Sequence, residues 1–227
     1  MALVGMQGEA KCATIRYYQT GFSMSAPTTI CDLRAIIERR EQERKNAVLT
    51  LVRGVRDGDI PAIAEGVQAV DQTCSWREAM SKIARLRKVP CASKEWFIGC
   101  WIVNGDSLRT DIGDDRILMD ALRVLLPPYT GAAMTLFRGD SFVNRCRRTY
   151  GMSWSSSPDV AQSFAQGVWQ KFDGGSVLLR AEVPSEAIIF SPAVHANDYE
   201  EYEYLVDRRY LGKVEVVKRF EQTSSGD

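Results

Sequence analysis

The sequence predicts an α+β protein, with a helical region first and a mainly antiparallel sheet after it. Between residues 28 and 128, apolar side chains recur at the three- and four-residue steps of amphipathic helices. After Pro128, short β-rich runs alternate with Gly, Ser, Pro and Asp. Helices grouped before strands are typical of the α+β class. We therefore expect a leader over 1–27, either poorly ordered or laid as an arm on the body, a helical region over 28–128 and a sheet domain over 129–227.

The first two expected helices follow one another closely. Thr29, with Asp32 three residues later, forms a capping box that opens the first helix, and apolar residues at helical spacing continue it to Val55. The pattern is then broken by three residues, which are Gly54, Gly58 and Pro61. A shorter second helix is expected to run to about residue 70.

Three further helices are expected before the sheet. Ser75 with Glu78 is a second capping box, which opens a helix through Arg87. This helix ends before Pro90, because the residue preceding a proline is pushed out of helical geometry. The last two helices are expected over 93–103, which is rich in aromatic residues, and over 114–126.

Five strands and one helix are expected in the sheet domain. The helix begins at Pro158, behind Ser157 as its N-cap, and runs to about Trp169. The strands are expected over 134–138, 177–183, 187–190, 203–207 and 214–220.

The composition is that of an ordinary globular protein, with 45% hydrophobic and 26% charged residues. Lys plus Arg and Asp plus Glu both number 29, so no net field favours nucleic acid or an acidic membrane. The longest apolar stretch, 96–103, is too short to span a bilayer. The six cysteines are not clustered and His195 is the one histidine, so no metal site is expected. Without a signal peptide, we expect a cytoplasmic protein with reduced, mostly buried thiols.

The first motif of chemical interest ends an apolar strand. Arg138 follows Phe137 and is itself followed by Gly139. A guanidinium group is suited to phosphate oxygens, and a glycine lets the backbone approach a ligand closely. The alternative is an arginine at the end of a strand, held in a surface ion pair.

The second motif is rich in serine. Ser153 and Ser155 alternate with Met152 and Trp154, so their hydroxyls are expected on the same side of a short strand. By itself, a turn rich in serine favours a purely structural explanation over a functional one.

The third motif pairs two carboxylates. Glu201 and Glu203 lie two residues apart at the entry to an apolar strand, so both side chains project to one face. Two adjacent carboxylates repel each other, which is unfavourable for stability and favours a functional role. The alternative is an acidic loop packed with tyrosines.

Together, the three motifs resemble those of mono-ADP-ribosyltransferases of the arginine–serine–glutamate, cholera-toxin-like class. The class has an arginine on its first core strand, then a Ser-Thr-Ser motif, and then a Glu-x-Glu motif, in that order along the chain. This sequence has Trp154 in place of the middle threonine. The resemblance covers about residues 135–217. It implies a split β-sandwich core and NAD as a substrate, with no metal. The helical region matches no motif of the class.

The resemblance also implies a role for each residue. Glu203 stabilises the positive charge that develops on the ribose when nicotinamide leaves, as in glycoside hydrolysis. Arg138 holds the NAD phosphates, Gly139 offers backbone groups to nicotinamide, and Ser153 binds the ribose and orients Glu203, with support from Ser155. Phe164 is a candidate to stack on nicotinamide, and its alternative is the core face of its helix, with Val160, Ala161 and Ala165.

The acceptor is expected to be a target protein. Glu201 takes the position that in the class assists transfer to arginine, and Tyr199 and Tyr202 fall on the acceptor-recognition loop. The class further implies a bacterial effector or toxin delivered into a host or target cell. Three other interpretations stay open. One is an NAD glycohydrolase, which uses water as acceptor, and another is an inactive interaction module of the same fold. The third is an interaction protein in which the helices over 28–126 bind the partner and the sheet domain is a scaffold.

Overall fold

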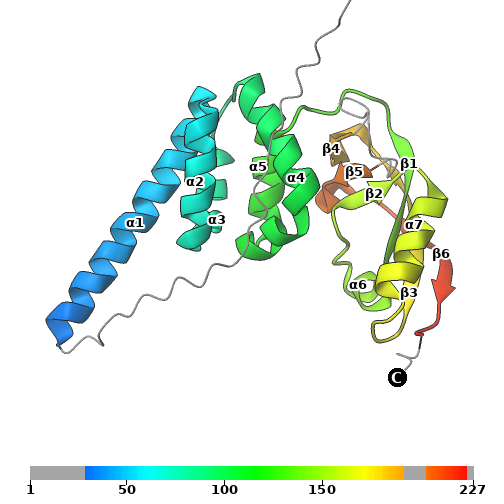
Figure 1. The fold of residues 1–227 in the computed structure, drawn as a ribbon. Coiled ribbons are helices and arrows are strands. Elements are labelled where there is room, and N and C mark those ends of the chain that lie inside the picture. The colour runs from blue at the N-terminus through cyan, green and yellow to red at the C-terminus, as the bar shows by residue number, and fades with distance from the viewer. Residues whose placement is uncertain (1–28, 192–202, 224–227) are drawn as a thin grey trace, which may run out of the picture. The chain divides into compact units, whose positions relative to one another are not determined.

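A computed structural model describes residues 29–191 and 203–223 (Figure 1). The described chain divides after Leu126 into a helical unit and a sheet unit. This division bears out the expected α+β class with a helical region first. The leader over 1–27 lies outside the described residues. Among the helices that the structure describes, none is long and apolar enough to cross a membrane.

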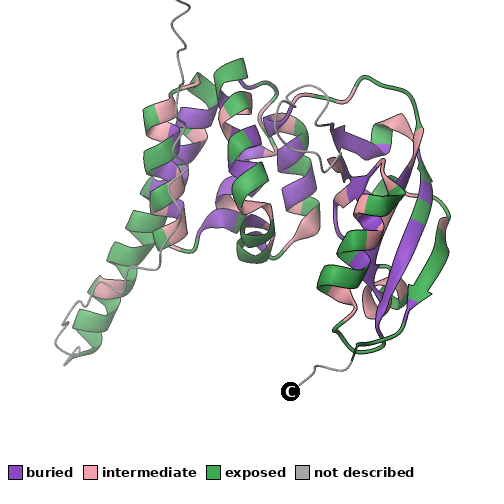
Figure 2. Cartoon of the chain, turned by 45° about the vertical axis from the view of Figure 1, so that its right-hand side comes forward, coloured by how far each residue is buried: buried purple, intermediate pink, exposed green. Residues whose placement is uncertain are grey.

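The helical unit contains five helices among its described residues: α1 (Ile30–Asp57), α2 (Ile60–Gln72), α3 (Trp76–Ile83), α4 (Cys91–Ile112) and α5 (Asp115–Leu125). The capping box of α1 is confirmed, since the Thr29 side chain accepts from the Asp32 amide and the Asp32 carboxylate accepts from the Thr29 amide at 3.0 Å. The first half of α1 is mostly exposed, and its buried residues begin at Ala47 (Figure 2).

Helices α1 and α2 approach closely through glycines. Gly58 ends α1 in a left-handed conformation, with φ 75°, as expected. Gly54, however, does not break α1 but lies inside it. A Cβ at Gly54 would lie 2.8 Å from the Ile63 nitrogen, and one at Gly66 would lie 2.6 Å from the Leu51 Cα. Tertiary packing therefore outweighs the poor helix propensity of glycine here.

Two helix ends differ from the expectation. Helix α3 begins after Ser75, but the second capping box does not form, because the Ser75 hydroxyl contacts the Val70 carbonyl and Thr73 instead. It also ends at Ile83 rather than Arg87. Helix α4 continues to Ile112 instead of stopping at residue 103. Burial of apolar residues in its last turns stabilises helix where the local composition favours a turn.

The thiols are free but are not buried as expected. Of the cysteines in the described ranges, Cys100 alone is buried, and four are exposed: Cys31, Cys74, Cys91 and Cys146. The expectation of mostly buried thiols is therefore wrong for this part of the chain.

Over its described residues, the sheet unit is built on one antiparallel sheet of six strands in the order β4-β5-β2-β1-β3-β6. Its strands are β1 (Met134–Ser141), β2 (Ser153–Ser155), β3 (Ser176–Val183), β4 (Ile188–Phe190), β5 (Glu203–Val206) and β6 (Val214–Phe220). Helix α7 (Pro158–Phe164) continues as a π-helix, η1 (Ala165–Trp169), and short 3₁₀ turns, η2 (Ser185–Ala187) and η4 (Arg208–Tyr210), follow β3 and β5. A short helix, α6 (Phe142–Arg147), was not expected.

The sheet consists of two halves joined at one position. Strand β1 pairs with β3 along its whole length, but with β2 only at Phe137 and Ser155. Strands β4, β5 and β2 form one half, and β1, β3 and β6 form the other. In Figure 1 the strands of the first half run across those of the second. The two halves therefore diverge on either side of a single pair.

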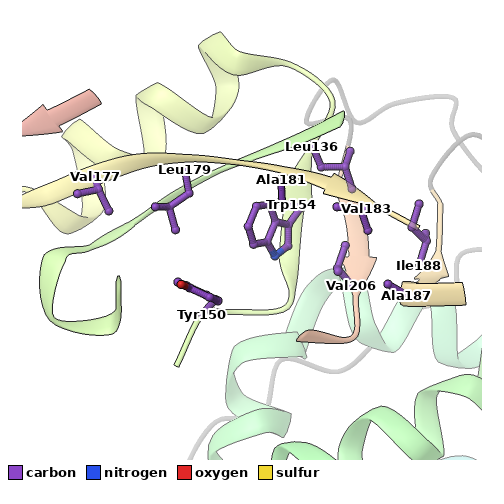
Figure 3. Packing of buried hydrophobic residues seen from close by; sticks show 10 residues of the cluster. All are labelled: Leu136, Tyr150, Trp154, Val177, Leu179, Ala181, Val183, Ala187, Ile188 and Val206. Atoms are coloured by element: carbon purple, nitrogen blue, oxygen red, sulfur yellow. The ribbon is translucent and has the colours of Figure 1, made fainter. Parts of the chain in front are cut away.

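The two faces of this sheet bury different side chains. What we call the core face carries a cluster that includes Leu136, Trp154, Leu179 and Val206 (Figure 3). What we call the helix face carries a smaller cluster, in which Ala161 and Ala165 of α7 and η1 pack with Leu178, Phe220 and Phe137. Because side chains alternate along a strand, each site residue belongs to one of these faces.

Candidate active site

A row of paired residues crosses the junction of the two halves. Phe137 on β1 pairs with Arg180 on β3 and with Ser155 on β2, and Ser155 pairs with Glu203 on β5. Residues directly opposite one another in antiparallel strands project to the same face. The side chains of Phe137, Ser155 and Glu203 therefore lie side by side on the helix face, although they come from three distant parts of the sequence.

The serine motif is held in place by the helix that follows it. Ser155 is 6% exposed, and its hydroxyl accepts from the Ser157 amide at 3.0 Å. Ser157 in turn caps α7, accepting from the Val160 amide. Ser153, two residues before Ser155, lies on the same face and is half-buried. The two serines thus share one face, as their spacing predicts, and the register of β2 with β5 places Glu203 on the same face.

Trp154 projects to the opposite, core face. It is 2% exposed, pairs with Tyr204 and donates from its indole nitrogen to the Gly151 carbonyl at 3.2 Å. The replacement of threonine by tryptophan therefore fills the core and does not change the face that carries Ser153 and Ser155. Tyr204 also lies edge-on to Tyr129, and burial, together with this neighbour, raises the pKa of Tyr129.

Arg138 lies between the diverging strands. It pairs with Leu179, so it belongs to the core face, opposite to Ser155 and Glu203. Its Nε donates to Asp140 at 2.7 Å and its Nη1 donates to the backbone carbonyl of Ser153. With a side chain that is 12% exposed, the guanidinium bridges β1 to β2 where backbone pairing has ended.

Asp140 and Gly151 complete this bridge. Asp140 is fully buried, and its Oδ2 accepts from the Gly151 amide at 3.3 Å as well as from Arg138. A Cβ at Gly151 would lie 2.0 Å from Nη2 of Arg138, so no other residue fits here without displacing the guanidinium. Sequence reasoning gave no role to Asp140 or Gly151. An acidic residue two positions after a strand arginine, and so on the same face of the strand, was the available signal for Asp140.

Gly139 is used for close packing within the protein. A Cβ there would lie 2.3 Å from both the Ala161 carbonyl oxygen and the Ala165 nitrogen. The glycine thus lets α7 and η1 approach β1, which gives it a structural reason independent of any ligand.

Phe164 is exposed, at 42%, on α7. Ala161 and Ala165 occupy the side of the helix that faces the sheet, so the core-face alternative for Phe164 does not hold. The π-helix that starts at Ala165 follows it directly; such turns are frequent at functional sites.

The rest of the glutamate motif lies outside the described residues. Glu201, Tyr199 and Tyr202 precede β5, and His195 lies in the same undescribed segment. Their expected roles therefore stay predictions. Among the described side chains, no group of three or more His, Cys, Asp or Glu is arranged to hold a metal ion.

Comparison of the chain with known protein families, with curated proteins and with solved structures finds no match. The site offers a carboxylate and two hydroxyl groups on one face of the sheet, and on the opposite face a guanidinium that is anchored at the split between its halves.

Proposed function

We propose that this protein is an NAD-dependent mono-ADP-ribosyltransferase, which cleaves the bond between nicotinamide and ribose and transfers ADP-ribose to a protein. The observation that carries the proposal is the pairing of Ser155 with Glu203 next to Phe137, the residue before Arg138. All three motifs that resemble the arginine–serine–glutamate class thus meet at one point of the sheet. The two diverging halves are compatible with the split β-sandwich of that class.

Glu203 has the central role in this proposal. Departure of nicotinamide leaves positive charge on the ribose, and a carboxylate beneath the sugar stabilises that charge in the transition state. Ser153 and Ser155, on the same face, supply hydroxyls that hydrogen-bond to the ribose and orient Glu203. Phe164, exposed on α7, supplies a ring to stack on nicotinamide.

The role of Arg138 in this proposal is to hold the serine segment and the NAD phosphates in place. The guanidinium holds the Ser153 segment through the backbone carbonyl, and we propose that NAD phosphates bind near it, at the split between the halves. Gly139 places backbone groups of β1 close to nicotinamide. Fixing the cofactor and the carboxylate in one geometry supplies much of the rate enhancement in such a reaction.

The acceptor is proposed to be an arginine side chain of a target protein. Glu201, two residues before Glu203, would assist the attack of the guanidinium, and Tyr199 and Tyr202 would contact the target. By likeness to the class, we propose a bacterial effector or toxin that acts in the cytoplasm of a host or target cell.

The proposal is tested by incubating the protein with NAD labelled in its adenylate part and a cell lysate. Nicotinamide release and protein labelling are measured for wild type, Glu203→Gln and Glu201→Gln, with Glu215→Gln, an exposed carboxylate on β6, as the control. We expect Glu203→Gln to lose nicotinamide release by about 100-fold or more, the loss typical of removing one stabilising group. Glu201→Gln should keep release and lose labelling.

The other outcomes separate the alternatives. Nicotinamide release by wild type without any labelling indicates an NAD glycohydrolase. NAD binding without release indicates an inactive module of this fold. Equal release by wild type and Glu203→Gln would refute the assignment of the catalytic carboxylate.

A further inference from the structure

We infer that Asp140 is a positioning residue of the candidate site, which fixes the Arg138 side chain and the segment that leads into the serine strand. This inference rests on the proposed function, since it concerns the reaction at Ser153, Ser155 and Glu203.

Asp140 is the centre of a saturated hydrogen-bond network. Oδ1 accepts from the Ser141 amide at 2.9 Å and from Nδ2 of Asn144 at 2.8 Å. Oδ2 accepts from Nε of Arg138 at 2.7 Å and from the Gly151 amide at 3.3 Å. The first oxygen therefore ties β1 to the start of α6, and the second faces the split between β1 and β2. A buried carboxylate with four donors has one well-defined orientation.

This network replaces the missing backbone pairs between β1 and β2. The strands pair only at Phe137 and Ser155. Beyond that position, the Gly151 amide reaches Asp140 and the Ser153 carbonyl reaches Arg138. The chain around Ser153 is thus held to β1 through two side chains, which themselves form an ion pair. Movement of either partner moves the Ser153 segment.

The orientation of Arg138 is fixed from two directions. Asp140 holds Nε from one side, and Gly151 limits the space on the other, since an added Cβ there would overlap Nη2. A buried guanidinium that lost its carboxylate would move toward solvent or toward another acceptor. Asp140 therefore decides where the N–H groups of Arg138 point.

The chain offers a matched control in a second buried aspartate. Asp207 is also fully buried and pairs with Arg209 at 2.7 Å. Both partners belong to one short stretch at η4, where Asp207 also accepts from the Arg209 amide. Loss of this carboxylate removes an ion pair with an equally buried aspartate, and the bonds that Arg209 makes to it lie outside the serine segment.

The experiment compares Asp140→Asn with Asp207→Asn in the full chain. Thermal unfolding and steady-state nicotinamide release, resolved into kcat and KM, are measured for each. Both variants should unfold at lower temperature. Asp140→Asn should also lower kcat by about 10- to 100-fold, the effect of misplacing a catalytic group by about 1 Å. Asp207→Asn should leave kcat within about twofold, which separates positioning from a general loss of stability.

A double-mutant cycle shows whether Asp140 acts through Arg138. If the two side chains work as a unit, Arg138→Gln with Asp140→Asn should lose no more activity than the worse single variant. Multiplied losses would overturn the inference. Should Asp140→Asn not fold, Gly151→Ala displaces the same guanidinium from the other side and should lower kcat in the same range.

The failures are distinguishable. A wild-type protein that releases no nicotinamide would overturn the proposed function and with it the role of Asp140 in catalysis. An active wild type, with Asp140→Asn losing stability like Asp207→Asn but keeping its kcat, would overturn the positioning role alone.

Discussion

The helical unit and the sheet unit differ in how far apart in the sequence their packed elements lie. In the helical unit, α1 and α2 are joined by a short turn at Gly58 and pack against each other directly. In the sheet, β2 lies next to β5, and β3 lies between β1 and β6, so most neighbouring strands are not consecutive in the chain. The candidate site falls where such distant strands meet.

Close packing at glycine is common to both units, but its consequences differ. In the helical unit, Gly54 and Gly66 set the distance between two helices. In the sheet unit, Gly139 and Gly151 set the distances of α7 and of Arg138 from the strands that carry the site. Substitution of a glycine in the helical unit should therefore lower stability alone, whereas substitution of a glycine beside the site should also lower activity.

The largest effect on both properties is expected for Gly139→Ala. Its Cβ would lie 2.3 Å from backbone atoms of Ala161 and Ala165, which cannot move without shifting α7. We expect a loss of about 3 kcal/mol in unfolding free energy, the upper part of the range for overpacking, together with loss of NAD cleavage. Urea unfolding measures the change in stability, and nicotinamide release measures the NAD cleavage. Gly167→Ala in η1 is the control, because an added Cβ there would meet no atom within 4 Å. It should change neither the unfolding free energy nor the nicotinamide release by much.

The next effect, confined to the helical unit, is expected for Gly66→Ala. Alanine normally stabilises a helix by about 1 kcal/mol relative to glycine. Here the new Cβ would lie 2.6 Å from the Leu51 Cα, so we expect a net loss of about 2 kcal/mol instead. In α4, an added Cβ at Gly99 would meet no atom within 4 Å, so Gly99→Ala should show the normal gain in stability. Calorimetry measures both, and the same sign for the two variants would contradict the close packing of α1 and α2.

A smaller, local effect is expected for Thr29→Ala. Loss of the capping box costs about 1 kcal/mol of helix stability at the start of α1. Because the buried residues of α1 begin only at Ala47, fraying of the first turns should leave the bundle intact. Hydrogen exchange should rise near residues 30–36 while the melting temperature stays the same. A lower melting temperature would show that the first half of α1 contributes to the bundle.

The smallest effect is a pH dependence at Asp111. Burial, and then the nearby charge of Asp71, raises the pKa of this carboxyl above 3.8 in the folded state. The charged form is therefore disfavoured by folding, and stability is lost as the pH rises through the raised pKa. Asp111→Asn should melt slightly higher than wild type at pH 7, and the difference should vanish well below pH 3.8. A difference in melting temperature that does not change with pH would exclude the charge of Asp111 as its cause.

Local signals predicted most helices and strands. The Thr29 capping box, the Ser157 cap before Pro158 and the strand over 214–220 all depend on residues close in sequence, and the structure confirms them. Two errors arose where packing overrode such signals, since Gly54 stays helical against Ile63 and α4 runs on to Ile112. A third arose from a competing local bond, because the Ser75 hydroxyl donates to the Val70 carbonyl rather than completing a capping box.

The sequence by itself determined which residues are suited to the chemistry and which of them share a face within one strand. The alternation of Ser153, Trp154 and Ser155 was enough to separate the serines from the tryptophan. The tertiary structure alone decided that Ser155 pairs with Glu203 and that Arg138 lies on the opposite face, held by Asp140 and Gly151. The physical reason is that strand register and buried ion pairs join residues far apart in the chain, and no local spacing encodes their contact.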